Sequence, residues 1–169
     1  MPETGFLCAC CDQRHDELPF AYGTPAPAYW TPDVEEIADS VLGEEQCVVG
    51  GEHFFVRARL VLPVVDDETD FEWGVWVSLS KDNFARASKL WDDPARVDEP
   101  PYFGWLSTVL PIYEPTTVNL KTYVHSEPVG TRPTVELEPT DHPLAVEQRT
   151  GITRDRVRAI AELLLHPEG

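Results

Sequence analysis

The sequence is short of basic residues. Its 13 lysines and arginines stand against 30 aspartates and glutamates, which gives a formal net charge of −17. A surface with this charge repels phosphate backbones and anionic lipid headgroups, so neither nucleic acid nor a membrane surface is an expected partner. A basic protein partner fits the charge. The other interpretation is an ordinary solvated surface, or a composition bias of the host, with ten arginines against three lysines.

The sequence also lacks long apolar runs. No stretch approaches the ~20 residues that a membrane-spanning helix needs. The acidic start at residues 1–5 has neither the basic region nor the apolar region of a signal peptide. We therefore expect a cytoplasmic protein. A chain of 169 residues with 42% hydrophobic residues is long enough to bury a core, and we predict a single domain over residues 1–169.

Common catalytic signatures are absent as well. The chain contains no H-E-x-x-H, no G-x-S-x-G, no P-loop and no G-x-G-x-x-G. We therefore assign no catalytic residue from the sequence, and a non-catalytic role is the expectation.

Three of the four cysteines gather near the start of the chain, where a metal site is predicted. Cys8 and Cys11 have the C-x2-C spacing that lets two thiolates bind one ion, and His15 follows closely. Thiols stay reduced in the cytoplasm, which favours metal binding over disulfides. A structural zinc site needs four nitrogen or sulfur donors, and Cys47 is the expected fourth ligand. Such a site is closed and structural.

Other residues could complete or replace this site. Cys10 could substitute for a neighbouring cysteine, and His53 competes as the fourth donor. His125 and His142 are further candidate ligands or bases. Two simpler interpretations remain: Cys47 is a buried core thiol, and His142 caps the helix that it precedes.

Hydrophobic periodicity predicts an α+β fold, a largely antiparallel sheet packed against helices. Residues 1–30 are predicted to be an irregular, zinc-knuckle-like segment that packs on an α+β body over residues 31–169. A helix is expected over residues 31–43, because a capping threonine precedes an apolar stripe with helical spacing. Strands are expected at residues 47–49, 53–62, 72–79, 102–106, 119–125 and 134–137. A short helix should follow Ser80, and two helices should close the chain.

Tryptophans mark both faces of one predicted strand. Strand alternation places Trp73 and Trp76 on opposite sides. Both are most simply core residues. An alternative is that the face carrying Trp76 covers a groove or a partner.

Several stretches of the chain resemble a known family. They are residues 6–11 with His15, 18–19, 51–57, 71–79, 101–106 and 137–145, among them W-G-V-W and H-P-L-A. On these residues the chain resembles the DUF2199 family, bacterial proteins of unknown function. The resemblance covers nearly the whole chain, supports a single domain and implies no activity. Family members often have C-x2-C-G at the start, where this chain has Asp12 in place of the glycine.

Two functional hypotheses follow. The first is a non-catalytic zinc-binding domain that acts as an acidic interaction, inhibitor or immunity-type partner of a basic protein. The alternative is a metal-assisted or histidine-dependent hydrolase, with a pocket between the sheet and the C-terminal helices that uses His53, His125 or His142.

Overall fold

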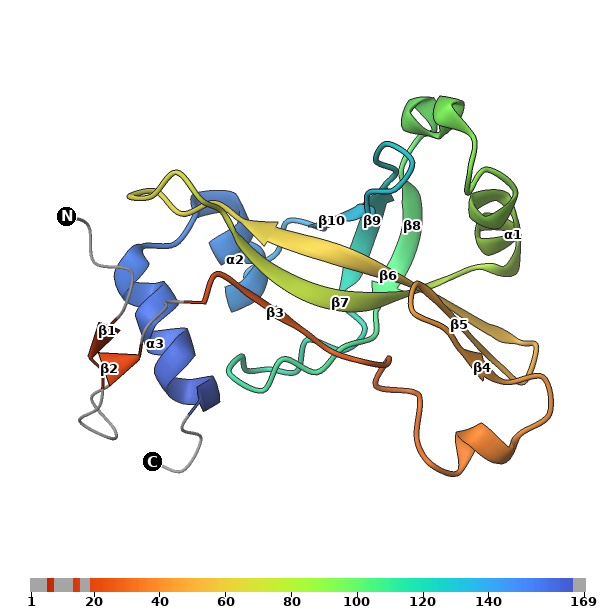
Figure 1. Ribbon diagram of the computed structural model, residues 1–169, viewed down its shortest axis with the longest axis horizontal. Coiled ribbons are helices and arrows are strands. Elements are labelled where there is room, and N and C mark those ends of the chain that lie inside the picture. The colour runs from red at the N-terminus through yellow and green to blue at the C-terminus, as the bar shows by residue number, and fades with distance from the viewer. Residues whose placement is uncertain (1–5, 8–13, 16–18, 166–169) are drawn as a thin grey trace.

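The protein is a mixed α+β molecule with one large sheet (Figure 1). The computed structural model describes residues 6–7, 14–15 and 19–165. The strands are β1 (Phe6–Leu7), β2 (Arg14–His15), β3 (Ala21–Gly23), β4 (Val41–Leu42), β5 (Gln46–Val49), β6 (His53–Leu62), β7 (Phe71–Leu79), β8 (Tyr102–Leu106), β9 (Lys121–His125) and β10 (Thr134–Leu137). The helices are α1 (Lys81–Lys89), α2 (Pro143–Thr150) and α3 (Arg154–Leu165), with 3₁₀ turns η1 (Val34–Glu36) and η2 (Pro94–Asp98).

Five strands form a ring that closes on itself. Strands β6 to β10 pair in chain order and antiparallel, and β10 then returns to β6. An odd number of strands cannot alternate direction all the way around, so one pair must be parallel. That pair is β10 with β6, where Thr134 lies opposite Arg59. Strands β5 and β4 extend the sheet beyond β6, and β3 lies parallel to β7.

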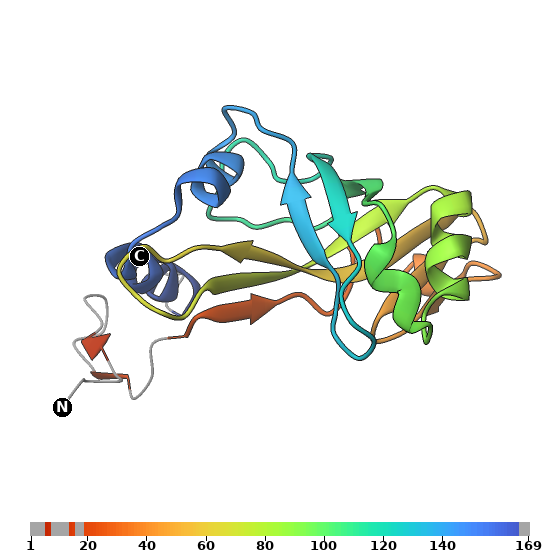
Figure 2. The ribbon, with the colours of Figure 1, turned by 90° about the horizontal axis from the view of Figure 1, so that it is seen from above.

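The main core lies inside the ring. Alternation along β6 and β7 turns one face of each strand inward, as predicted for residues 53–62 and 72–79. The inward side chains of these two strands are Val56, Ala58, Leu60, Leu62, Phe71, Trp73, Val75, Val77 and Leu79. The helices were expected to cover one side of the sheet. Instead, α2 and α3 lie towards one end of the molecule and α1 towards the other (Figures 1 and 2). The strands bury their own inner face by closing, which a sequence pattern does not reveal.

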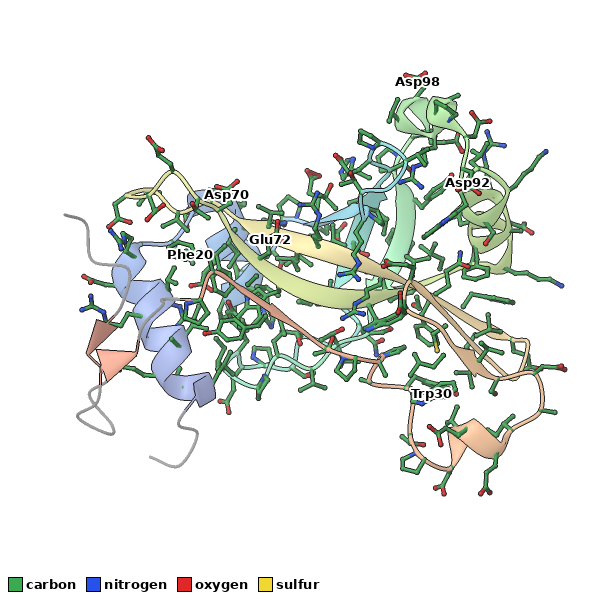
Figure 3. All side chains as sticks on the ribbon, viewed as in Figure 1. Phe20, Trp30, Asp70, Glu72, Asp92 and Asp98 are labelled. Carbon is green, nitrogen blue, oxygen red and sulfur yellow. The ribbon has the colours of Figure 1, made fainter. Side chains whose placement is uncertain are left out.

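A second, smaller core lies on the outer face of β5, β6 and β7. It contains Val34, Cys47, Val49, Phe55 and Trp76, with Trp30 packed against it (Figure 3). The indole Nε1 of Trp76 donates a hydrogen bond to the carbonyl of Thr24 at 3.0 Å. The face that carries Trp76 is therefore covered by a segment of its own chain, not by a partner.

The helix predicted over residues 31–43 is wrong. This segment forms only η1, then a turn with Asp39 at φ 61°, then β4. Of the apolar stripe Val34 is buried, whereas Ile37 is 48% and Val41 64% exposed. A helix this short is marginal unless its stripe is buried. Residues Val41–Leu42 pair with β5 as a strand instead of extending a helix. The Ser40 hydroxyl also accepts a hydrogen bond from the Gly50 N–H at 2.9 Å.

Candidate functional site

The predicted zinc ligands are only partly placed. Cys8, Cys10 and Cys11 lie outside the described residues, and of His15 only the backbone is described, on β2. Cys47 is on β5, at the opposite end of the molecule from β2 (Figures 1 and 2). Within the part of the chain that the structure describes, no group of three histidine, cysteine or acidic side chains could hold a metal ion. The zinc site stays a prediction, and the fold does not bring Cys47 to β2.

Cys47 has the surroundings of a core thiol. Its side chain is 1% exposed among apolar residues of the smaller core. Burial raises the pKa of this thiol to about 11, because the thiolate would lose its hydration. A thiol that stays protonated at neutral pH is neither a nucleophile nor a ready metal ligand.

The candidate histidines do not converge. The imidazole of His53 packs against Tyr29, with ring centroids 4.7 Å apart and planes tilted by 40°. His125 lies at the end of β9 and lines an open hollow of about 580 Å³. No other histidine lines that hollow, and His142 has separate partners. The hollow lies between the sheet and α2, where the hydrolase alternative expected its pocket, but of the three candidate histidines only His125 lines it. The hydrolase alternative stays a prediction.

His142 is the N-cap of α2. Its Nδ1 accepts a hydrogen bond from the Leu144 N–H at 3.1 Å. The other nitrogen, Nε2, must then carry the proton, and it donates to the carbonyl of Pro115 at 2.8 Å. Both ring nitrogens are occupied, so this side chain fastens the 107–118 loop to the helix. The capping interpretation fits this geometry.

A groove centred on Trp91 lies on the surface, and no motif in the sequence predicts it. Trp91 follows α1, is 36% exposed and lines three of the surface hollows, which we call together the Trp91 groove. The largest of the three, about 460 Å³, has an apolar floor of Val41, Val48, Phe84 and Trp91. The second, about 260 Å³, runs from Trp91 along the 129–132 loop. The sequence analysis predicted only the short helix after Ser80, which Trp91 follows.

Acidic side chains rim this groove. Glu44 and Glu45 border the larger hollow, and Asp92 lines the second one near the end of α1 (Figure 3). Glu45 pairs with Arg132 at 2.9 Å. No ion pair of Glu44 or Asp92 is found within the described residues. Arg96 and Arg132 line the same hollow as Asp92, and Arg132 also interacts electrostatically with Glu44. The rim therefore has three carboxylates against two guanidinium groups, and an apolar floor below this acidic excess suits a side chain that combines an aliphatic stem with a positive charge.

The walls of the groove are held by specific contacts. Gln46 donates through Nε2 to the Ser88 hydroxyl at 3.0 Å, which ties the β4–β5 hairpin to α1. Phe84 of α1 packs on Phe54, with ring centroids 5.0 Å apart. The groove is therefore formed before any partner arrives, which lowers the entropy cost of binding.

Arg96 organises the other wall. Its guanidinium donates hydrogen bonds of 2.6–2.9 Å to the carbonyls of Glu127, Trp91, Pro128 and Thr131. It also lies 5.7 Å from the centre of the Trp91 ring. One buried cation thus fixes both Trp91 and the 126–133 loop.

These features define a class of protein: a mixed α+β molecule with a closed five-stranded ring and a preformed surface groove. The chain belongs to the DUF2199 family, described as an uncharacterized protein conserved in bacteria, whose model matches residues 7–152. No match was found among the curated proteins or among the solved structures. Across the described ranges, no helix is both long and apolar enough to cross a membrane.

Proposed function

We propose that this protein is a non-catalytic interaction module, an acidic inhibitor-type partner of a basic protein, and that it binds that partner through the Trp91 groove. The observation that carries the proposal is the apolar floor under an acidic rim. Exposed tryptophans in preformed hollows are the usual anchors of protein interfaces. The net charge of −17 would steer a basic partner towards the groove and speed the encounter.

The groove favours a lysine or arginine side chain of the partner. Its stem would lie on Val41, Val48 and Trp91, and its charged head would reach Glu44 or Asp92. An acidic or neutral segment would leave the acidic excess of the rim unbalanced and would lose the steering.

The test is a binding measurement on the full-length protein. Partners captured from host lysate at low salt would be purified and titrated against the wild type, Trp91→Ala and Trp105→Ala. Trp105 is a matched control, because it is also an exposed tryptophan but lies on β8, outside the groove. We expect Trp91→Ala to weaken binding by roughly tenfold or more, as for an interface anchor, and the control to bind normally.

The acidic rim has its own test. Glu44→Gln combined with Asp92→Asn should slow association and flatten its salt dependence, since these carboxylates supply the local field. Equal binding by all variants, or a partner whose affinity ignores salt, would refute the proposal.

We also propose a structural zinc held by Cys8, Cys11, His15 and a fourth donor. Cys47 is the fourth ligand predicted from the sequence, but it lies on β5, away from β2. Support comes from the C-x2-C spacing, whereas the apolar surroundings of Cys47 argue for a different fourth donor. Elemental analysis of protein purified without added metal should give about one zinc per chain. Loss of zinc in Cys8→Ala but not in Cys47→Ala would keep the site and exclude Cys47 from it. Absence of zinc from the wild type would end the proposal.

A further inference from the structure

The edge of the sheet beside the Trp91 groove is unpaired. β4 is the last strand of the eight-stranded sheet, and only β5 pairs with it (Figure 1). The Gly43 N–H donates to the Gln46 carbonyl at 2.8 Å, so the backbone of Gly43 bonds towards β5. Successive residues of a strand alternate in this respect, and the N–H and C=O of Leu42 therefore point to the free edge. Across the described residues, no backbone partner of Leu42 lies on that side.

Apart from its short length, this edge has no protection against pairing. Natural edge strands are commonly very short, or carry a charged side chain, a proline or a bulge. Residues 40–43 are serine, valine, leucine and glycine, and Val41 is 64% and Leu42 36% exposed. An uncharged edge with exposed apolar side chains is a template on which another strand can pair.

The two faces of β4 meet different surroundings. Val41 lies on the face of the Trp91 groove, and Leu42 faces the other way, on the side of the smaller core. Gly43 has no side chain and lines the larger hollow together with Glu44. A strand added to this edge would therefore alternate. Its side chains across from Val41 and Gly43 would enter the groove, and the side chain across from Leu42 would lie on the other face.

The charge around β4 selects the occupant. Residues 31–46 contain six acidic residues and no basic residue: Asp33, Glu35, Glu36, Asp39, Glu44 and Glu45. Arg132 pairs with Glu45, and Arg57 donates a hydrogen bond to the carbonyl of residue 44. Six carboxylates against these two guanidinium groups leave an acidic excess. This excess disfavours pairing of β4 with β4 of a second copy and attracts a basic segment.

We propose that a basic segment of the partner adds to β4 as an extended strand, with lysine or arginine side chains in the Trp91 groove alternating with apolar side chains on the face of Leu42. The backbone of the segment would pair with Leu42, and a basic side chain across from Gly43 would lie over the hollow and reach Glu44. Main-chain pairing supplies affinity in such complexes, and the alternate side chains supply specificity. The inference rests on the proposed function and names the form in which the partner is recognised.

The test uses the full-length protein and a capped synthetic hexapeptide that alternates lysine and valine. The control is a peptide of the same composition with all lysines ahead of all valines. We expect the alternating peptide to bind roughly tenfold more tightly or better, because only alternation sends every lysine to one face. Hydrogen exchange followed by NMR should show the Leu42 amide exposed in the free protein and protected in the complex. Equal binding of the two peptides, or an unprotected Leu42 amide at saturation, would overturn the proposal.

Methylation of the peptide backbone isolates the main-chain bonds. Methylating every second amide removes the donors along one edge of an extended peptide. The set of amides that faces β4 should lose binding when methylated, and the other set should bind like the unmodified peptide. Equal affinities of the two methylated peptides would exclude strand pairing, whatever their charge contributes.

A pair of variants at one position tests the edge from the side of the protein. Leu42→Pro removes the outward N–H, which no bond of the fold uses, whereas Leu42→Ala keeps this N–H and shortens the side chain. We expect Leu42→Pro to weaken binding of the alternating peptide by roughly tenfold or more, and Leu42→Ala by much less. Equal losses at equal unfolding midpoints would overturn the pairing. If Leu42→Pro lowers the midpoint, the methylated peptides decide the question.

Trp91→Ala separates this inference from the proposed function. If Trp91→Ala weakens binding of the alternating peptide and Leu42→Pro does not, the groove binds a basic segment but β4 does not pair with it. The strand inference is then wrong, and the proposed function stands. Binding that ignores both variants and the salt concentration would overturn both proposals.

Discussion

At the scale of single residues, the surroundings of a side chain decide its role. His142 is a candidate base by its chemistry, yet both of its ring nitrogens bond to backbone groups. Cys47 is a candidate ligand, yet it lies among apolar side chains. The helix start at Pro143 indicates the capping role, but Pro115 and the apolar neighbours of Cys47 come from distant segments, so the sequence left the roles of both residues open.

The capping role of His142 predicts a graded loss of stability. His142→Ala removes the cap and the bond to Pro115, and we expect a loss of about 2 kcal/mol in the free energy of unfolding. His142→Asn can still cap α2, but its shorter side chain cannot also reach the Pro115 carbonyl. This variant should therefore lose about half as much free energy of unfolding. Urea denaturation measures both. Equal losses in the two variants would contradict the assigned hydrogen bonds.

Burial of Cys47 predicts slow thiol chemistry and alkaline sensitivity. Its pKa is raised from 9.0 to about 11, so its contribution to stability is fully present below pH 9 and is lost as the pH rises towards 11. In Cys47→Ala part of this alkaline loss should disappear from the unfolding curve measured between these pH values. In the native protein, this thiol should react with a thiol reagent only as fast as the structure opens. Immediate reaction would show that Cys47 is accessible.

At the scale of elements, close strand pairing sets strict limits on side-chain size. A Cβ on Gly104 of β8 would lie 2.5 Å from the Ser78 carbonyl oxygen and 2.6 Å from a methyl group of Val77, both on β7. This glycine is therefore required by the approach of one strand to the next. It stands in the stretch Tyr102–Leu106, whose pattern predicted a strand without predicting this constraint.

Gly104→Ala should force β7 and β8 apart. We expect it to lower the free energy of unfolding by about 2–3 kcal/mol, as for overpacking in a core. The matched control is Gly23→Ala on β3, where the nearest atom to the added Cβ is 3.5 Å away. Thermal unfolding of both variants gives the comparison. If Gly23→Ala lost as much stability as Gly104→Ala, the loss would come from a change in strand propensity and not from the contact of the added Cβ with β7.

Glu99 links α1, η2 and β8. Its carboxylate accepts hydrogen bonds from the Arg86 guanidinium, including one of 2.9 Å, and from the Tyr102 hydroxyl at 2.7 Å. The bond from Arg86, then that from Tyr102, lowers the pKa of Glu99 below its usual 4.5. The stabilisation is therefore present above pH 4.5 and is lost as the pH falls through the lowered value.

Removing this carboxylate should make the free energy of unfolding depend less on pH in the acidic range. Glu99→Gln should be less stable than the wild type at neutral pH, and the difference should shrink below pH 4.5. Denaturation series at several acidic pH values measure the slope. Glu52→Gln, at an exposed turn position, is the control and should follow the wild type. A constant difference at all pH values would show that the charge of Glu99 plays no part.

At the scale of the whole molecule, charge acts against compaction. Thirty acidic residues on a folded chain of this size repel one another, and most ion pairs that offset them are partly exposed, such as Arg132 with Glu45 and Arg154 with Asp67. Exposed pairs contribute about 0–1 kcal/mol each. Added salt should therefore change the free energy of unfolding more by screening this repulsion than by weakening the exposed ion pairs.

Added sodium chloride should raise the thermal unfolding midpoint at neutral pH. Screening weakens the repulsion among 30 acids more than it weakens a few exposed ion pairs. Calorimetry over increasing salt measures the shift. A midpoint that falls with salt would mean that the ion pairs dominate.

Elements with a regular burial pattern can be predicted from the amino-acid sequence. Strands β6, β7 and β8 and helices α1, α2 and α3 were predicted close to their observed positions, because alternation or a capped apolar stripe reports on burial directly. The mixed α+β class and the family membership followed as well. The segment at residues 31–43 failed because its apolar residues have helical spacing, but most of them remain exposed.

The way in which these elements combine depends on contacts between distant segments. The closure of β10 on β6 and the meeting of α1, the 43–48 hairpin and the 126–133 loop around Trp91 join segments far apart in the chain. Packing between such segments depends on shape and distance in space, which periodicity along the sequence does not encode.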